Sequence, residues 1–423
     1  MDQTKKITAL LNYQKHMQRN KIIFAIIFII GSTLLGYLLY RVFFYTPPTT
    51  PPTLQDVTSD SNQFPGIGGA GDRSGNIVTP PDQLPITQDT ATGGTQGTSD
   101  ITAPIIKEIT SSAVSNVTTK SGVSPKFYSE QDGKFYKLNA AGEVQPLSDK
   151  VFFNVQNVTW SPTQNETIIE YPDGANIYYN FDTKEQVTLP KHWESFSFDP
   201  SGQKIASKSM SLSPENRWLV SADPKGGSIE LIEALGTNAN EVIVDWSPNK
   251  QVVALSTTGQ ALGSGRQEVL FIGQNGENFP STVVEGRGLK TQWSKNGSNL
   301  LYSVHSSRSD FKPELWIVSG DPNSIGSGRK FLQINTWADK CAFADDRFVF
   351  CGVPTSLDKG VGFAPSLADG IPDELYKIDS ATGLKSKIPF PDNNVIDSIF
   401  LSDDQHTLYF TDKNQPGLFE IAL

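Results

Sequence analysis

Histidine and cysteine are scarce in this sequence, which limits the chemistry that the chain can carry. Its 423 residues include four histidines and two cysteines, a poor supply of ligands for a transition-metal site. The chain also lacks the G-x-S-x-G turn of serine hydrolases, the H-E-x-x-H helix of zinc peptidases, the Walker loop and the D-x-D-x-D-G calcium loop. The sequence therefore predicts no catalytic residues, no metal site and no cofactor.

Positive charge is scarce after the first 46 residues. The chain has a net charge of −10, of which residues 1–46 contribute +5, so the remaining residues carry −15. A protein that binds nucleic acid needs a basic surface to neutralise phosphates. The acidic remainder therefore excludes nucleic acid as the expected partner.

A run of nineteen residues without charge is present at residues 22–40. At ~1.5 Å of helix rise per residue, this run spans a hydrocarbon core of about 30 Å. Five basic residues precede the run, whereas only Arg41 follows it before Arg73. The positive-inside rule then predicts a cytoplasmic tail at residues 1–21 and a single-pass signal anchor at residues 22–45. No small-residue cleavage site follows, so we expect the anchor to be retained in the cell membrane.

Residues 46–100 are rich in Pro, Gly, Thr, Ser and Gln and poor in large apolar side chains. Such a segment cannot bury enough surface to fold, and the sequence predicts a disordered linker. A flexible chain of this length has an end-to-end distance of ~40 Å. The linker would hold the following domain, residues 101–423, away from the membrane on the extracytoplasmic side.

From residue 101 onward a repeated pattern of short strands replaces the linker. Its first line reads VTWSP (158–162), FSFDP (196–200), VDWSP (244–248), TQWSK (291–295), CAFAD (341–345) and SIFLSD (398–403). Each of these first segments leads through a polar turn into a second and a third apolar segment, such as TIIEY and NIYYNFD. In most units a fourth short strand follows. Four antiparallel strands per unit, with units 38 to 57 residues apart, are typical of a β-propeller. The sequence predicts an all-β, seven-bladed propeller, with six or eight blades as alternatives.

The two ends of the propeller are expected to share one sheet. The first unit comprises AVSNVTT (113–119) and residues 126–148, whereas the last unit has only three strands before Leu423. The segment PIIKEI (104–109) can supply the missing fourth strand, which would remove an exposed sheet edge.

The W-S-P or F-D-P turns and the E-L-aromatic-x-I/V third strands resemble those of TolB-like and WD-repeat-like propellers. This resemblance covers roughly residues 101–423 and implies the architecture rather than a function, because propellers host many activities. The arrangement also resembles membrane-anchored propellers of bacterial envelopes. The propeller of dipeptidyl peptidase IV-type enzymes is similar, but no hydrolase domain follows the propeller in this sequence.

One position of the repeat holds an aromatic residue in six units. Because the residues occupy equivalent positions, we expect them to pack between blades rather than to form a ligand platform. They are Trp160, Phe198, Trp246, Trp293, Phe343 and Phe400.

Cys341 and Cys351 flank the turn of one expected hairpin. If residues 345–347 form the turn, Phe343 faces Val349, Ala342 faces Phe350, and Cys341 faces Cys351. Directly opposed cysteines in an oxidising compartment favour a disulfide. Two buried free thiols are the alternative.

The loops between second and third strands are long in four units, at residues 209–216, 257–266, 305–313 and 352–373. In a propeller these loops lie on one face, which gathers basic and aromatic residues. The candidate ligand-binding residues are Arg217, Arg266, Arg308, Phe311, Lys312, His192, His305, Trp193 and Trp337, with Lys359 and Phe363 nearby. Such a face suits an anionic or peptide ligand, although solvated loops with ordinary charge are the alternative.

The sequence therefore favours a membrane-tethered extracytoplasmic propeller that binds a protein or peptide partner of the cell envelope. The alternative is a propeller-type hydrolase or lyase acting on envelope glycans or peptides, for which His192 and His305 could act as acid and base. Converging carboxylates or histidines at the mouth of the central channel would favour the enzyme. A third possibility is a secreted form released by proteolysis in the linker.

Overall fold

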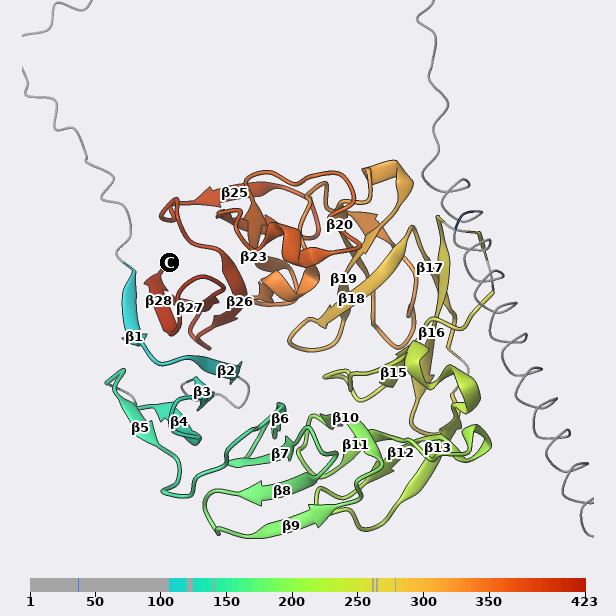
Figure 1. The fold of residues 1–423 in the computed structure, drawn as a ribbon. Coiled ribbons are helices and arrows are strands. Elements are labelled where there is room, and N and C mark those ends of the chain that lie inside the picture. The colour runs from blue at the N-terminus through green and yellow to red at the C-terminus, as the bar shows by residue number, and fades with distance from the viewer. Residues whose placement is uncertain are drawn as a thin grey trace, which may run out of the picture. The chain divides into compact units, whose positions relative to one another are not determined.

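Seven four-stranded antiparallel sheets surround a central axis in the computed structural model of the chain (Figure 1). The structure describes residues 106–119, 125–139, 141–260, 262–263, 265–277 and 279–423, together with Tyr37. Each sheet is one blade, and the blades follow one another around the ring in chain order. The all-β propeller is confirmed, and the number of blades is seven rather than six or eight.

The predicted cytoplasmic tail, signal anchor and linker lie outside the described residues, apart from Tyr37. In the part of the chain that the structure describes, no helix combines the length and the apolar character needed to cross a membrane.

Blades 1 to 3 contain twelve strands. They are β2 (Val114–Thr118), β3 (Lys126–Ser129), β4 (Lys134–Leu138) and β5 (Val144–Pro146) in blade 1; β6 (Asn157–Trp160), β7 (Glu166–Glu170), β8 (Asn176–Asn180) and β9 (Gln186–Leu189) in blade 2; and β10 (Trp193–Phe198), β11 (Ile205–Ser209), β12 (Trp218–Ala222) and β13 (Glu230–Ala234) in blade 3. In Figure 1, β6 lies nearest the centre of the ring and β9 at its rim.

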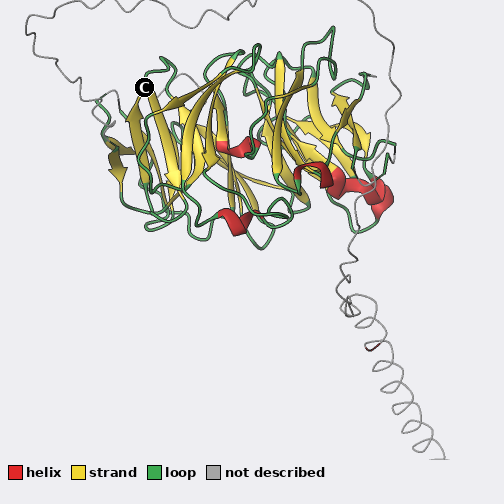
Figure 2. Cartoon of the chain, turned by 90° about the horizontal axis from the view of Figure 1, so that it is seen from above, coloured by secondary structure: helices red, strands yellow, loops and turns green. Residues whose placement is uncertain are grey.

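Blades 4 to 6 repeat this order. They comprise β14 (Val242–Val244), β15 (Val252–Ser256), β16 (Gln267–Gly273) and β17 (Thr282–Val284) in blade 4; β18 (Arg287–Trp293), β19 (Asn299–His305), β20 (Pro313–Ser319) and β21 (Lys330–Phe331) in blade 5; and β22 (Cys341–Phe343), β23 (Phe348–Pro354), β24 (Asp373–Asp379) and β25 (Lys385–Ile388) in blade 6. Among the described residues, the segments between strands also form five short 3-10 helices: η1 (Pro214–Asn216), η2 (Gly236–Glu241), η3 (Ser307–Ser309), η4 (Ala338–Lys340) and η5 (Pro365–Ala368). Figure 2 shows the blades side-on, with loops at both ends of the strands.

Blade 7 is built from distant parts of the chain. Its strands β26 (Ile396–Leu401), β27 (Thr407–Asp412) and β28 (Leu418–Ala422) are followed in the sheet by β1 (Lys107–Thr110). Lys107 pairs with Glu420 in the β1–β28 ladder, and their side chains form an ion pair of 2.8 Å. The predicted closure of the last blade by the segment before the first blade is therefore confirmed.

Tight polar turns join the first and second strands of each blade. In blade 3, the Asp199 carboxylate accepts backbone N–H bonds from Ser201, Gln203 and Lys204. Aspartate in such a turn satisfies the backbone locally. Burial raises the pKa of Asp199, but a hydrogen bond from the Ser201 hydroxyl and these backbone bonds together outweigh it, and the pKa lies below its usual range.

Apolar clusters fill the gaps between neighbouring blades. Five of the six predicted first-strand aromatics are buried and belong to these clusters, all except Phe400. The indole N–H groups of Trp160 and Trp293 each donate to a backbone carbonyl of the preceding blade, on Asn116 at 2.7 Å and on Asp245 at 3.2 Å. These contacts confirm inter-blade packing as the role of this position.

In blade 7 the prediction that Phe400 packs between blades is wrong, and Leu401 occupies the equivalent position. Leu401 pairs with Leu408 directly before the turn and is buried, as Trp160 pairs with Thr167 in blade 2. Phe400 lies one residue earlier and is only half-buried. Because side chains alternate along a strand, a shift of one residue moves the side chain to the other face.

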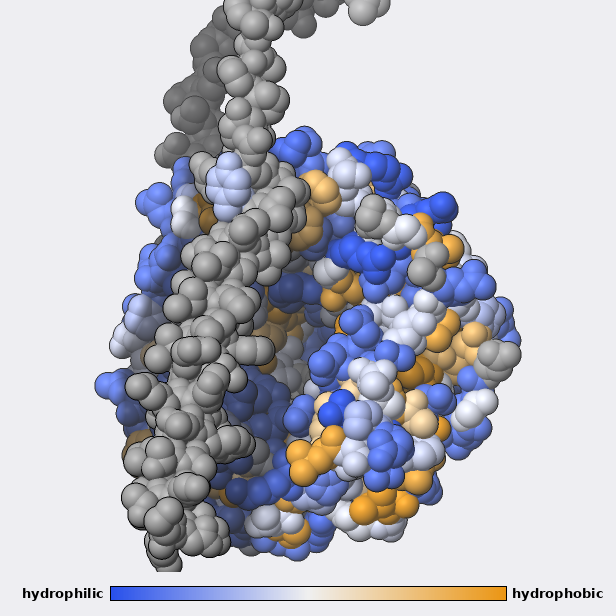
Figure 3. Space-filling model, turned by 45° about the vertical axis from the view of Figure 1, so that its right-hand side comes forward, coloured by the Kyte–Doolittle hydropathy of each residue, from blue (hydrophilic) through white to orange (hydrophobic). Residues whose placement is uncertain are grey.

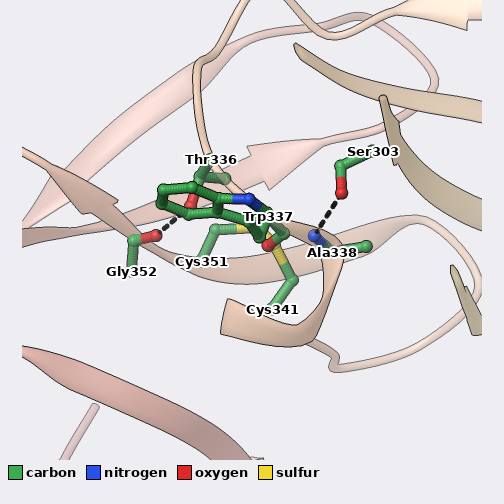
Figure 4. The surroundings of a disulfide bond; sticks show 7 residues. All are labelled: Ser303, Thr336, Trp337, Ala338, Cys341, Cys351 and Gly352. Carbon is green, nitrogen blue, oxygen red and sulfur yellow. Dashed lines mark hydrogen bonds between the residues drawn. A yellow bond between two sulfur atoms is a disulfide. The ribbon is translucent and has the colours of Figure 1, made fainter. Parts of the chain in front are cut away.

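Cys341 and Cys351 form a disulfide inside blade 6. The register is the predicted one, with Cys341 opposite Cys351, Ala342 opposite Phe350 and Phe343 opposite Val349. Figure 4 shows Trp337 beside the bond, and the Cys341 sulfur lies 3.6 Å from the Trp337 carbonyl oxygen. Both cysteines are fully buried, so the bond contributes to the core of the blade.

We expect the Cys341→Ala/Cys351→Ala variant to lose about 2–3 kcal/mol of unfolding free energy, because the disulfide closes only a short ring in the unfolded chain. The two strands are already joined by a hairpin, so the β-rich circular dichroism should persist. Chemical denaturation of the oxidised protein and the variant measures the loss. Mass analysis after alkylation without reductant serves as the control, and two freely alkylated cysteines there would contradict the pairing.

Candidate binding face

Four long loops and the connections between successive blades lie at the same end of the propeller, which we call the loop face. The loops join the second and third strands of blades 3 to 6 and comprise residues 210–217, 257–266, 306–312 and 355–372. Antiparallel strands reverse direction at every turn, so the second turn of a blade lies at the end where the chain passes to the next blade. The residues predicted to bind a ligand therefore lie at one end of the propeller, in these loops, in the connections between blades or at the adjoining strand ends.

The loops of blades 5 and 6 are bonded to each other. The backbone N–H groups of Gly360 and Gly362 donate to the carbonyls of Asp310 at 2.8 Å and Phe311 at 2.7 Å. Asp310 and Phe311 have φ values of 53° and 57°, the left-handed region that few residues other than glycine adopt. The Lys359 ammonium adds an ion pair of 3.4 Å with Asp310. The two loops therefore form one surface.

An aromatic group lies on this joint surface. The Phe363 ring is 66% exposed and contacts Phe311 at 4.7 Å and His305 at 4.8 Å between ring centroids. His305 is buried, and a Cβ added at Gly288 or Gly362 would lie within 2.5 Å of its side chain. The two glycines thus leave the space that the imidazole fills, while Phe363 faces solvent.

A cavity of about 240 Å³ lies between the loops of blades 4 and 5. Arg266 and Arg308 both line it, together with Glu285, Leu262, Gly265, Ser306 and Ser307. Both arginines are exposed. The structure thus brings two of the predicted ligand-binding residues to one cavity.

Other predicted residues of the loop face have different surroundings. Arg217 donates from Nε to the Ser211 carbonyl at 2.9 Å and so holds its own loop closed. His192 is exposed directly before β10, and Lys312 is half-buried at the end of the 306–312 loop. None of these three side chains lines the cavity.

Trp193 and Trp337 are buried on the inner side of the loop face. Trp193 packs between blades 2 and 3 in a cluster that includes Leu189 and Phe196. Trp337 packs against Val361 and Ala368 of the 355–372 loop. The indole ring of Trp193 therefore packs in the core between two blades, and the long loop of blade 6 covers that of Trp337.

Large apolar side chains are also exposed on the loop face. Besides Phe363, these are Phe153, Leu212 and Leu367, which are 65%, 99% and 64% exposed. In Figure 3, hydrophobic residues appear as separate patches among hydrophilic ones. Neither their number nor their exposure could be read from the sequence, because a loop has no periodic pattern that distinguishes buried from exposed positions.

A second cavity, of about 510 Å³, lies where blade 7 meets blade 1. Its lining includes the carboxylates of Glu130, Asp369, Asp397 and Asp412. The Lys413 ammonium lies 2.7 Å from Asp369 and 3.7 Å from Asp397. Burial opposes protonation of Lys413, but the bond to Asp369 and the negative charges of the nearby carboxylates together outweigh it, and the pKa of the ammonium is raised. This group could not be predicted from the sequence, because its members come from separate blades.

Burial lowers the pKa of His305 from its ordinary value of 6.5. As the pH falls below about 6.5, the unfolded chain then takes up a proton before the folded protein does, so stability decreases. We expect His305→Asn to reduce this loss between pH 7.5 and 5.5, measured by denaturant unfolding at each pH. Replacement of the exposed His406 is the control, and an equal change of slope in the two variants would contradict the prediction.

Within the described ranges, no group of three or more His, Cys, Asp or Glu side chains could hold a metal ion. No protein-family model matches this chain, and no match to its sequence was found among the curated proteins.

Solved structures share the fold at low sequence identity. An oligogalacturonate lyase in complex with manganese has a TM-score of 0.52 and 14% identity, over 75% of this chain and 93% of that chain. The oligogalacturonate lyase of Vibrio parahaemolyticus has a TM-score of 0.51 and 12% identity, over 76% and 94%. The β-propeller domain of Myceliophteria thermophila Cps50 (Swd1) has a TM-score of 0.50 and 12% identity, over 75% and 98%. These similarities concern the propeller architecture, which hosts unrelated functions.

Proposed function

We propose that this protein is a membrane-tethered, extracytoplasmic propeller that binds a protein or peptide of the cell envelope through its loop face, without catalysis. The observation that carries this proposal is the exposure of Phe153, Leu212, Phe363 and Leu367 on that face. Exposed apolar side chains beside arginines are typical of protein interaction sites. The bonded loops of blades 5 and 6 would present Phe363 in a fixed position, which reduces the entropy lost on binding.

The location follows from the N-terminal sequence. Residues 22–40 and the basic residues before them favour a signal anchor with the propeller outside the cell membrane. The Cys341–Cys351 disulfide supports the same compartment, because disulfides persist where the environment is oxidising. Protease added to intact spheroplasts should remove the propeller and leave a small membrane-bound fragment. Protection of the propeller would reject the proposed topology.

Photocrosslinking in native membranes tests the binding proposal. The full chain, with a crosslinker next to Leu367, is compared with the variant Leu212→Ser/Phe363→Ser. The matched control, Ile229→Ser/Leu384→Ser, removes apolar side chains that are 54% and 69% exposed in turns at the opposite end of the propeller. Loss of a discrete crosslinked partner in the first variant alone is the expected result. Equal crosslinking by both variants would refute the proposal.

A second candidate function is a glycan lyase or hydrolase, and one observation favours it. The cavity between blades 7 and 1 brings Lys413 together with Asp369 and Asp397, and a lysine and carboxylates can act as proton donors and acceptors. Two propellers of similar fold are oligogalacturonate lyases. Incubation of the purified protein with oligogalacturonate tests this candidate. Formation of unsaturated products that is lost in Lys413→Met would favour the enzyme.

A further inference from the structure

We infer that the cavity between blades 4 and 5 is a carboxylate-binding subsite, which takes an acidic side chain of a peptide that also places an apolar side chain against Phe363. This inference rests on the proposed function and names the ligand of the loop face. It is carried by two guanidinium groups without partners, by the size of the cavity and by the aromatic group beside it.

Arg266 and Arg308 form no hydrogen bond and no ion pair through their side chains with any residue that the structure describes. Glu285, the acidic residue of the lining, lies 3.4 Å from Arg329. Arg287 donates from Nη2 to the Gly263 carbonyl at 2.9 Å and thereby holds the 257–266 loop. The positive charge of the two lining arginines is therefore not neutralised by the carboxylate that shares the cavity.

The charge of Arg308 also acts on a carboxyl group outside the lining, that of Glu314. The charge of Arg308 lowers the pKa of Glu314, but burial is the larger influence, and the pKa of Glu314 is raised overall. The two side chains form no ion pair in the structure. The cavity lining itself thus holds two guanidinium groups, those of Arg266 and Arg308, and one carboxyl group, that of Glu285, in a chain whose net charge is −10. A local excess of positive charge on an acidic protein attracts anions.

The volume of the cavity suits a side chain rather than a large ligand. At ~30 Å³ per water molecule in the liquid, about 240 Å³ accommodates a carboxylate group with several waters. A guanidinium group binds a carboxylate through two parallel N–H bonds. Two arginines on facing loops can therefore hold one carboxylate from both sides.

The cavity and the exposed aromatic group share one loop. Arg308 lies in η3, and Phe311 follows within the same 306–312 loop, where its ring contacts Phe363. Asp310, between them, is neutralised by Lys359. An extended peptide can thus place an acidic side chain in the cavity and an apolar side chain against Phe363 and Leu367. The exposed apolar side chains favour a peptide over an anionic sugar as the source of the carboxylate.

Fluorescence anisotropy with the full chain in detergent micelles tests the subsite. The probes are two labelled peptides, acetyl-Gly-Glu-Gly-Phe-Gly and its glutamine analogue. We expect the glutamate peptide to bind more tightly, and Arg266→Ala/Arg308→Ala to weaken its binding by about tenfold or more, as lost charge-assisted bonds do. The glutamine peptide should bind both proteins equally. Arg266→Lys/Arg308→Lys should restore part of the affinity, because lysine keeps the charge but not the planar fork.

Lys184→Ala/Lys295→Ala is the matched control, because it removes two positive charges from turns at the opposite end of the propeller. Equal binding of the glutamate peptide to the arginine variant and to the wild type would overturn the inference, as would no binding to the wild type. Binding of oligogalacturonate in place of the peptide would overturn the peptide assignment. If the arginine variant shows no loss of affinity yet the photocrosslinked partner still depends on Phe363, the subsite fails while the proposed function stands.

Discussion

The variant Asp373→Asn is expected to lose about 3–5 kcal/mol of unfolding free energy, because it leaves the charge of Lys340 buried without a partner. The Lys340 ammonium lies 2.8 and 2.7 Å from the two carboxylate oxygens of Asp373. The side chain of Asp373 is fully buried and that of Lys340 is 7% exposed. One carboxylate oxygen also accepts the backbone N–H of Ile396 at 2.7 Å. The pair thus joins η4 and β24 of blade 6 to β26 of blade 7.

The neighbouring residue provides a matched control. Glu374 forms an ion pair of 2.8 Å with Lys387, but both side chains are partly exposed, so Glu374→Gln should cost about 1 kcal/mol or less. The double variant Lys340→Met/Asp373→Leu removes both buried charges and should be more stable than either single variant. Denaturant unfolding measures all of these free energies. Equal losses for Asp373→Asn and Glu374→Gln would show that the buried pair has no special role.

Deletion of residues 106–110 should lower the unfolding free energy by about 3 kcal/mol or more, since it removes β1 and exposes apolar side chains of blade 7. Leu418 is fully buried next to β1, and Ile106 packs against the cluster that contains Phe419 and Ile421. The deletion also leaves the backbone groups of β28 without partners on one side. Thermal and denaturant unfolding should both show the loss.

A five-residue deletion within residues 50–95 is the control for this experiment. It shortens the chain before the propeller by the same length and should leave the melting temperature of the propeller unchanged. If the two deletions have the same effect, β1 does not contribute to the stability of blade 7.

The repeats made most of the fold predictable from the sequence. Each blade is a local unit, in which turn residues and alternating apolar residues indicate the strands, and the pairing of Cys341 with Cys351 followed from counting outward from one turn. Phe400 was misplaced because the first strand of blade 7 offers two adjacent large apolar residues, Phe400 and Leu401. Only packing against the neighbouring blade determines which of them is the anchor.

The loop face was less predictable, because its arrangement depends on contacts between different blades. Arg266 and Arg308 are predicted to bind a ligand because they are basic residues in long loops. That both line one cavity depends on the hydrogen bonds that position their loops. Trp193 and Trp337 are predicted as aromatic residues near the same face, and both are buried. The burial of Trp337 depends on Val361 and Ala368 in the long loop of blade 6, whose sequence has no regular pattern.

Blade 7 combines the first strand of the ring with the last three, so the propeller can be completed only at the end of synthesis. Lys107 and Glu420 are 313 positions apart, so the ribosome makes β1 before every other strand of the ring and its partner β28 after all of them. The other six blades consist of consecutive strands and can form as the chain emerges. The ring itself can close only after translation of β28, and such long-range pairing is slow. A chain whose synthesis stops before β28 keeps unpaired sheet edges, and it is therefore prone to aggregation and to proteolysis.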